Sequence, residues 1–181
     1  MKNFARSLST IAALILATNV SVAATSDGSL GASSTGTADV SLTIDEKFQI
    51  SGMTAFTFGS WSGTGDLTQN DDICIYHNGD GSYKVTITDN SVLSAGFAVE
   101  DAADANEIAM SVNFNDETGT TGSIAVVDGT ATAAQSGANT ASTNCGGGNS
   151  ANIEVVVAEA DLNAAPAGAY DSQITVLVEP D

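Results

Sequence analysis

The chain has 181 residues and a formal net charge of −18, because only 4 basic residues stand against 22 acidic ones. Such an acidic surface repels phosphate backbones and anionic lipid, so the composition argues against nucleic-acid-binding and membrane-surface roles. Once an export signal is set aside, the length is that of one ordinary domain.

The first residues have the order of a secretory signal. Lys2 and Arg6 precede an apolar run over residues 11–17, and small residues end it at Val22-Ala23-Ala24. The apolar run is shorter than the roughly 20 residues that span a bilayer. We therefore expect residues 1–24 to be removed on export, and no part of the mature chain to insert into a membrane.

A short segment at residues 38–44, named segment 38–44 below, alternates apolar and polar side chains with the period of a β-strand. Residues 25–37 before it are poor in structure-forming residues. One face of the segment would be apolar, formed by Ala38, Val40, Leu42 and Ile44. Two interpretations are open: the first strand of a self-contained sandwich, or a strand offered to another chain.

Further short strands are predicted along the rest of the chain, separated by Gly, Asn and Asp. Asn78-Gly79-Asp80-Gly81 predicts a hairpin between two of them, and residues 158–165 predict a helical turn that Pro166 ends. Residues 130–152 predict a loop. This pattern is typical of an all-β antiparallel sandwich. The expected strands are Phe48–Gly52, Ile73–Tyr76, Tyr83–Ile87, Ile108–Phe114, Ile153–Val157 and Tyr170–Val178.

Cys74 and Cys145 are the only cysteines, and export would carry them into an oxidising compartment. We expect them to form a disulfide, and two separate buried thiols are the alternative. A bridge that closes a loop of about 70 residues contributes on the order of 4 kcal/mol in the chain-entropy model.

No catalytic equipment is recognisable, and we predict neither an enzyme nor a bound cofactor or metal. His77 is the only histidine and adjoins the expected hairpin, where we interpret it as a solvated strand end. The sequence has no nucleophile elbow, phosphate loop or zinc-protease motif. A glycosidase-like carboxylate pair is the remaining enzymatic option, but chance pairs are expected among 22 acidic residues.

Two groups of residues suggest ligand-binding alternatives. Asn78, Asp80 and Ser82 alternate as in a calcium loop, but Tyr83 and Asp89 stand where that loop needs its glycine and its bidentate glutamate. Trp61 is flanked by glycines, and an exposed aromatic residue in that setting can stack on a sugar ring. The alternative is that Trp61 fills the end of the apolar core.

The residues around segment 38–44 resemble a known family. Gly-Thr-x-Asp-Val-x-Leu-Thr-Ile over residues 36–44, then a short strand from Phe48, is similar to the donor segment and first strand of archaic chaperone-usher pilins and spore-coat-U-like domains. Gly168-x-Tyr170 before an alternating C-terminal strand is similar to the closing strand of such subunits. The family commonly has a cysteine in the first strand, where this chain has Phe48 and Ile50.

The resemblance implies an immunoglobulin-like sandwich that lacks its last strand and is completed by donor-strand exchange. Residues 25–45 would be the extension that carries the donor strand, and residues 46–181 the pilin domain. A periplasmic chaperone and an outer-membrane usher would be partners in transit to a surface fimbrium, a homo-polymer of subunits. The inserted residues would be Ala38, Val40, Leu42 and Ile44, and the edge strand of the accepting groove would present Tyr170, Ile174, Val176 and Val178.

Two rival functions come from other classes. The first is a monomeric secreted or periplasmic module that binds sugar or calcium, in which segment 38–44 completes its own sandwich. The second is a secreted glycan-acting enzyme, which needs two acids about 5 to 9.5 Å apart in a cleft.

Overall fold

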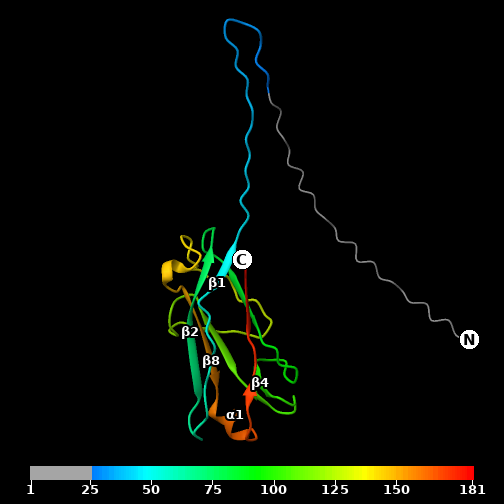
Figure 1. Ribbon diagram of the computed structural model, residues 1–181, viewed down its shortest axis with the longest axis vertical. Coiled ribbons are helices and arrows are strands. Elements are labelled where there is room, and N and C mark those ends of the chain that lie inside the picture. The colour runs from blue at the N-terminus through cyan, green and yellow to red at the C-terminus, as the bar shows by residue number, and fades with distance from the viewer. Residues whose placement is uncertain (1–25) are drawn as a thin grey trace, which may run out of the picture. The chain divides into compact units, whose positions relative to one another are not determined.

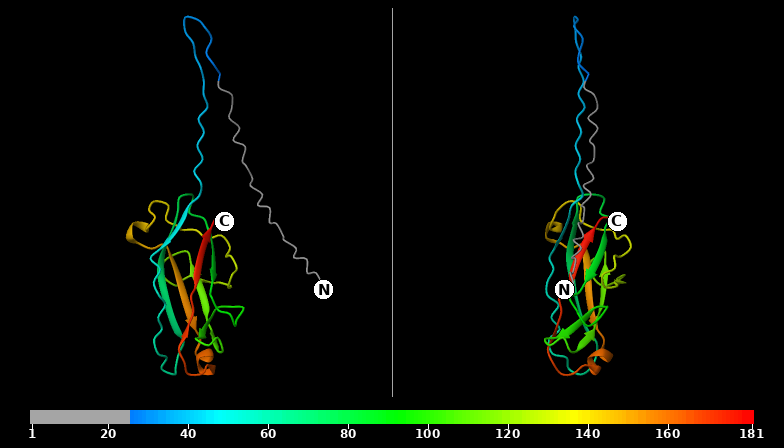
Figure 2. Two further views of the ribbon diagram at one scale, coloured as in Figure 1. Left: turned by 45° about the vertical axis from the view of Figure 1, so that its right-hand side comes forward. Right: turned by 90° about the vertical axis from the view of Figure 1, so that its right-hand side faces the viewer.

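A computed structural model describes residues 26–181 of the chain (Figures 1 and 2). The expected signal, residues 1–24, lies outside the described residues. The chain divides into two units, Met1–Ile44 and Asp45–Asp181.

In the described part of the first unit, Ser26 and Thr37 pair in antiparallel fashion through two backbone hydrogen bonds of 3.1 and 2.9 Å. Segment 38–44 follows, and it is not in a strand here. Its apolar side chains are exposed: Val40 by 95%, Leu42 by 85% and Ile44 by 73%. Large apolar side chains with the period of a strand are thus left in solvent.

The second unit is built almost entirely of strands, and every ladder between them is antiparallel, which confirms the predicted all-β sandwich. The helical turn expected over residues 158–165 is present as α1. The elements in chain order are β1 (Phe48–Ser51), β2 (Leu67–His77), β3 (Lys84–Thr88), β4 (Ala98–Asp101), β5 (Glu107–Ala109), β6 (Ser111–Asn115), β7 (Ile124–Ala125), the 3₁₀ turn η1 (Cys145–Gly147), β8 (Ala151–Val157), α1 (Glu159–Ala164), β9 (Tyr170–Asp171) and β10 (Thr175–Glu179).

The strands form two layers around one apolar core (Figure 2). One layer is a five-stranded sheet in the order β1-β2-β8-β6-β7; the other combines the pair β10-β3 with the sheet β5-β4-β9. Side chains from both layers alternate inward, as strands with one buried face require. The most buried large residues are Tyr83, Phe114, Ile73, Ile75, Ile87 and Ile153. Burial raises the pKa of the Tyr83 hydroxyl above its ordinary value, and the charge of Asp116 adds to this.

The predicted hairpin at residues 78–81 is wrong. Over its last residues, Cys74–His77, β2 bonds to β1 along one edge and to Asn139 along the other, so neither edge is free for β3. The chain instead crosses at these residues to the opposite layer, where β3 pairs with β10. His77 at the end of β2 is correspondingly not solvated, since it is only 2% exposed.

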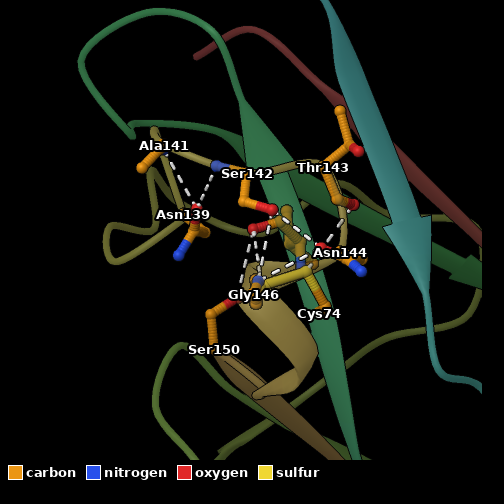
Figure 3. The surroundings of a disulfide bond; sticks show 10 residues. Cys74, Asn139, Ala141, Ser142, Thr143, Asn144, Gly146 and Ser150 are labelled. Atoms are coloured by element: carbon orange, nitrogen blue, oxygen red, sulfur yellow. Dashed lines mark hydrogen bonds between the residues drawn. A yellow bond between two sulfur atoms is a disulfide. The ribbon is translucent and has the colours of Figure 1, made fainter.

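A long connection, residues 126–150, runs between β7 and β8 and is fastened to the domain at several points. Its backbone bonds to that of Tyr83, Val85 and Ile75. The predicted disulfide is present: Cys74 in β2 joins Cys145 in η1, with a Cα–Cα distance of 5.8 Å. Figure 3 shows how side-chain bonds of Asn139 and Ser142 shape the loop around this bridge.

The expected strand Tyr170–Val178 is interrupted. Its first residues form β9 against β4, residues 172–174 are in no strand, and β10 pairs with β3. Among the described residues, no helix is long and apolar enough to cross a membrane.

Candidate functional site

An open apolar groove runs along the second unit, between the chain that follows β1 and the chain that contains β9 and β10. It consists of two adjoining hollows of about 570 and 660 Å³. Phe58, Gly59, Val99 and Tyr170 line both, so the hollows are two halves of one site. We call them the near half and the far half of the groove; the near half lies beside residues 53–57 and the far half beside Trp61.

The first wall is formed by residues 53–61. Phe56 and Phe58 alternate inward and pack partly buried against the core. The Thr54 N–H donates to the carboxylate of Asp71 at 2.6 Å. Within the described residues, no other strand pairs with residues 55–60, so this wall presents an unpaired backbone edge.

The second wall is formed by residues 170–174 and continues into β10. Among residues 26–181, β10 forms a ladder only with β3, and β9 only with β4, so each has one edge without a strand partner. Ile174, Val176 and Val178 are half-buried against the core, while Leu177 between them is 52% exposed on the outer face. The Oδ1 atom of Asn90 accepts the Gln173 N–H at 2.6 Å and holds the wall between its two strands.

The floor is apolar and comes from strands far apart in the sequence. Val99 of β4, Met110 between β5 and β6, and Val155 of β8 lie under the near half. The far half has Ile108, Val157, Leu67 of β2 and Leu162 of α1. A slot with an apolar floor and two free backbone edges can accept an extended, alternating strand, because such a strand finds hydrogen-bond partners on both sides and buries one face.

The structure places the predicted site residues in different surroundings. Tyr170 and Ile174 line the groove; Val176 and Val178 lie further along the same wall and pack on the core. Trp61 lines the far half, and its indole N–H donates to the Gly65 carbonyl at 2.9 Å. Sequence reasoning missed Phe56, Phe58 and Met110. The alternation Phe56-Thr57-Phe58 carried a usable signal for the first two.

The residues considered for calcium are engaged within the protein. Asp80 accepts the Ser82 N–H at 2.8 Å, and the side chain of Asn78 bonds to the backbone of Asp45 and Lys47. No group of three or more His, Cys, Asp or Glu side chains in residues 26–181 is placed to hold a metal ion. The N–H of Ala105 and the side-chain amide of Asn106 hold the pKa of Asp101, the last residue of β4, below its ordinary value.

Comparison with known proteins gives one informative result. No family model matches the sequence, and no curated protein matches it. Among solved structures, the fold is similar to a chain of a chaperone–tip adhesin complex vital for synergistic activation of CFA/I fimbriae biogenesis, with a TM-score of 0.52 and 14% identity over 76% of this chain. The match spans 42% of that chain, less than half of its length, and at this identity it shows the fold alone.

Proposed function

We propose that this protein is a structural, non-catalytic subunit of a surface fimbria that polymerises by donor-strand exchange, as in archaic chaperone-usher pilins and spore-coat-U-like proteins. Segment 38–44 of one copy enters the groove of the next. The observation that carries the proposal is that one chain has both halves of such a joint: an apolar slot with two free edges and an exposed apolar segment with the period of a strand. The similar fold of a chain in a complex that serves fimbriae biogenesis supports it.

The energy of insertion is sufficient. Burying Val40, Leu42 and Ile44 contributes roughly 1.5 to 3 kcal/mol each, and each ladder hydrogen bond adds about 1 kcal/mol. Seven extended residues span about 23 Å, which is also the length of the seven residues 53–59 along the first wall. Ordering the segment opposes insertion, but burial and the ladder bonds outweigh that cost.

The reach of the chain favours insertion into a second copy. A segment folding back onto its own domain would turn at residues 45–47, because β1 begins at Phe48 and is held along β2. At about 3.3 Å per residue, Ala38 would then reach only the level of Thr54. The wall continues to Trp61, roughly 23 Å further, so the far half would stay empty. A segment from a second copy is not covalently linked to the receiving domain, so this limit on its position does not apply to it.

Repeated insertion in this sense does not close. Each copy offers one surface and receives on another, so the contact is heterologous and produces a fibre. We propose that a periplasmic chaperone covers the groove until an outer-membrane usher exchanges it for the next subunit, and that the export signal brings the chain to that compartment.

The groove itself is tested by a pair of substitutions on one wall. Ile174→Asp places a carboxylate where the donor's apolar face would lie, and we expect fibres to be lost because an unpaired charge in a closed apolar slot costs several kcal/mol. Leu177→Asp makes the same change three residues on, on the outer face, and should leave fibres intact. Electron microscopy of surface fibres, with circular dichroism of each purified variant, measures both.

Equal fibre yields from the two folded variants would contradict the assignment of the groove. A purified wild-type chain that stays monomeric at high concentration would instead favour the binding module, for which the Trp61 side of the groove would be the sugar site.

A further inference from the structure

The three residues that join segment 38–44 to β1 are held to the end of β2 by Asn78. Its Oδ1 atom accepts the Lys47 N–H at 2.7 Å, and its Nδ2 atom donates to the Asp45 carbonyl at 3.0 Å. The Asn78 backbone N–H donates to the Lys47 carbonyl at 3.2 Å. Asn78 thus makes three hydrogen bonds to residues 45–47, two through its side chain and one through its backbone.

The platform beneath Asn78 is tightly packed. The neighbouring His77 ring stacks on Phe48, with centroids 4.2 Å apart and planes inclined by 18°. Its Nδ1 atom accepts the Gly81 N–H at 3.3 Å. A Cβ atom on Gly79 would lie 2.7 Å from the ring, so only glycine lets the crossover fold over His77. Asn78 therefore projects from a part of the domain that is closely fixed.

The anchored residues begin directly after the last apolar residue of the segment. Ile44 would be the final side chain inserted into a neighbour, and the carbonyl of Asp45 is already bound to Asn78 of its own domain. No residue lies between Ile44, the last side chain inserted, and Asp45, the first anchored residue. Any bend between two joined subunits would have to occur at this single junction, where Asn78 limits it.

We propose that Asn78 is a positioning residue for assembly, which fixes residues 45–47 so that the joint between successive subunits is stiff and has a defined angle. The inference rests on the proposed function, because it concerns the joint that donor-strand exchange makes.

The first measurement is made on the monomer. In the full chain carrying Leu42→Asp, which keeps it from polymerising, Asn78→Ala removes the acceptor for the Lys47 N–H. Loss of that bond should make exchange of the Lys47 amide about tenfold faster, the factor that corresponds to one hydrogen bond. Asn163→Ala is the matched control, since Asn163 bonds only to the Glu159 carbonyl in α1 and should leave Lys47 unchanged.

The second measurement is made on fibres of the otherwise wild-type chain. Electron micrographs give the distribution of angles between consecutive subunits, which a merely structural role would not alter. We expect Asn78→Ala to broaden it at unchanged fibre yield. Asn78→Asp should broaden it less, because its carboxylate still accepts the Lys47 N–H but no longer donates to the Asp45 carbonyl. Asn163→Ala should match the wild type.

The results separate the two claims. If wild-type and Asn78→Ala fibres have the same angular distribution, or if exchange of the Lys47 amide is unaffected, the positioning role is overturned while the fimbrial proposal stands. If the wild-type chain forms no fibres with any usher and chaperone, the proposed function fails, and this inference fails with it.

Discussion

Replacing Leu42 by aspartate is expected to abolish polymer while leaving export and folding intact. Leu42 is 85% exposed in the free chain, so its replacement removes no packing from the domain. In a neighbour's groove the same change forfeits about 1.5 to 3 kcal/mol of burial and adds the cost of an unpaired buried carboxylate. A combined loss of about 5 kcal/mol lowers the association constant by more than three orders of magnitude.

Thr43→Asp is the matched control, because it introduces the same charge on the polar face of the segment. It should keep fibres, with at most a modest effect from added repulsion. The measurement compares fibres on the cell surface and the sedimentation of purified chain for both variants. Assembly by Leu42→Asp at the wild-type level would show that the face with Ala38, Val40, Leu42 and Ile44 is not the one inserted.

Removing the disulfide is expected to cost the domain on the order of 4 kcal/mol of unfolding free energy, since the bridge closes a loop of about 70 residues in the unfolded chain. The cost matters because most of residues 126–150 is irregular and depends on a few backbone bonds to β2 and β3. Single domains of this size have only about 5 to 15 kcal/mol in total.

Chemical denaturation of the monomeric Leu42→Asp chain, with and without Cys74→Ala and Cys145→Ala together, measures this effect. The double replacement leaves no free thiol to confuse the comparison. Ser142→Ala in the same loop removes only hydrogen bonds to Asn144 and Gly146 and should cost about 1 kcal/mol. A similar small loss for the cysteine pair would mean that the loop is held without the bridge.

The fold class was predictable from local signals. Period-two alternation, turn residues and the scarcity of helix formers indicated the sandwich, and Pro166 correctly limited α1. The cysteine pair was predictable from the export signal and the count of two. Each of these depends on neighbouring residues or on composition.

The wrong predictions concern places where segments that are distant in sequence compete for the edge of one strand. The sequence Asn78-Gly79-Asp80-Gly81 has the local chemistry of a tight hairpin, but β1 and Asn139 occupy both edges of β2 next to it, and no residue near the turn reveals that. The burial of His77 follows from the same crossover, which folds Gly79 over its ring. Val99, Met110 and Val155 meet only because β4, β8 and the link between β5 and β6 come together in the fold, so sequence patterns could not predict the floor of the groove.

The arrangement of lysines has a practical consequence. Lys47 and Lys84 are the only sites for trypsin within residues 26–181. Lys84 is half-buried inside the ladder of β3 with β10, whereas the side chain of Lys47 is exposed at the junction with β1. The bonds of Asn78 to the Lys47 N–H and carbonyl must open before trypsin can cut after Lys47, and that cut would sever the covalent link at a joint of a proposed fibre. A filament cut at every joint would separate into intact domains, each with the donor segment of its neighbour still bound in its groove.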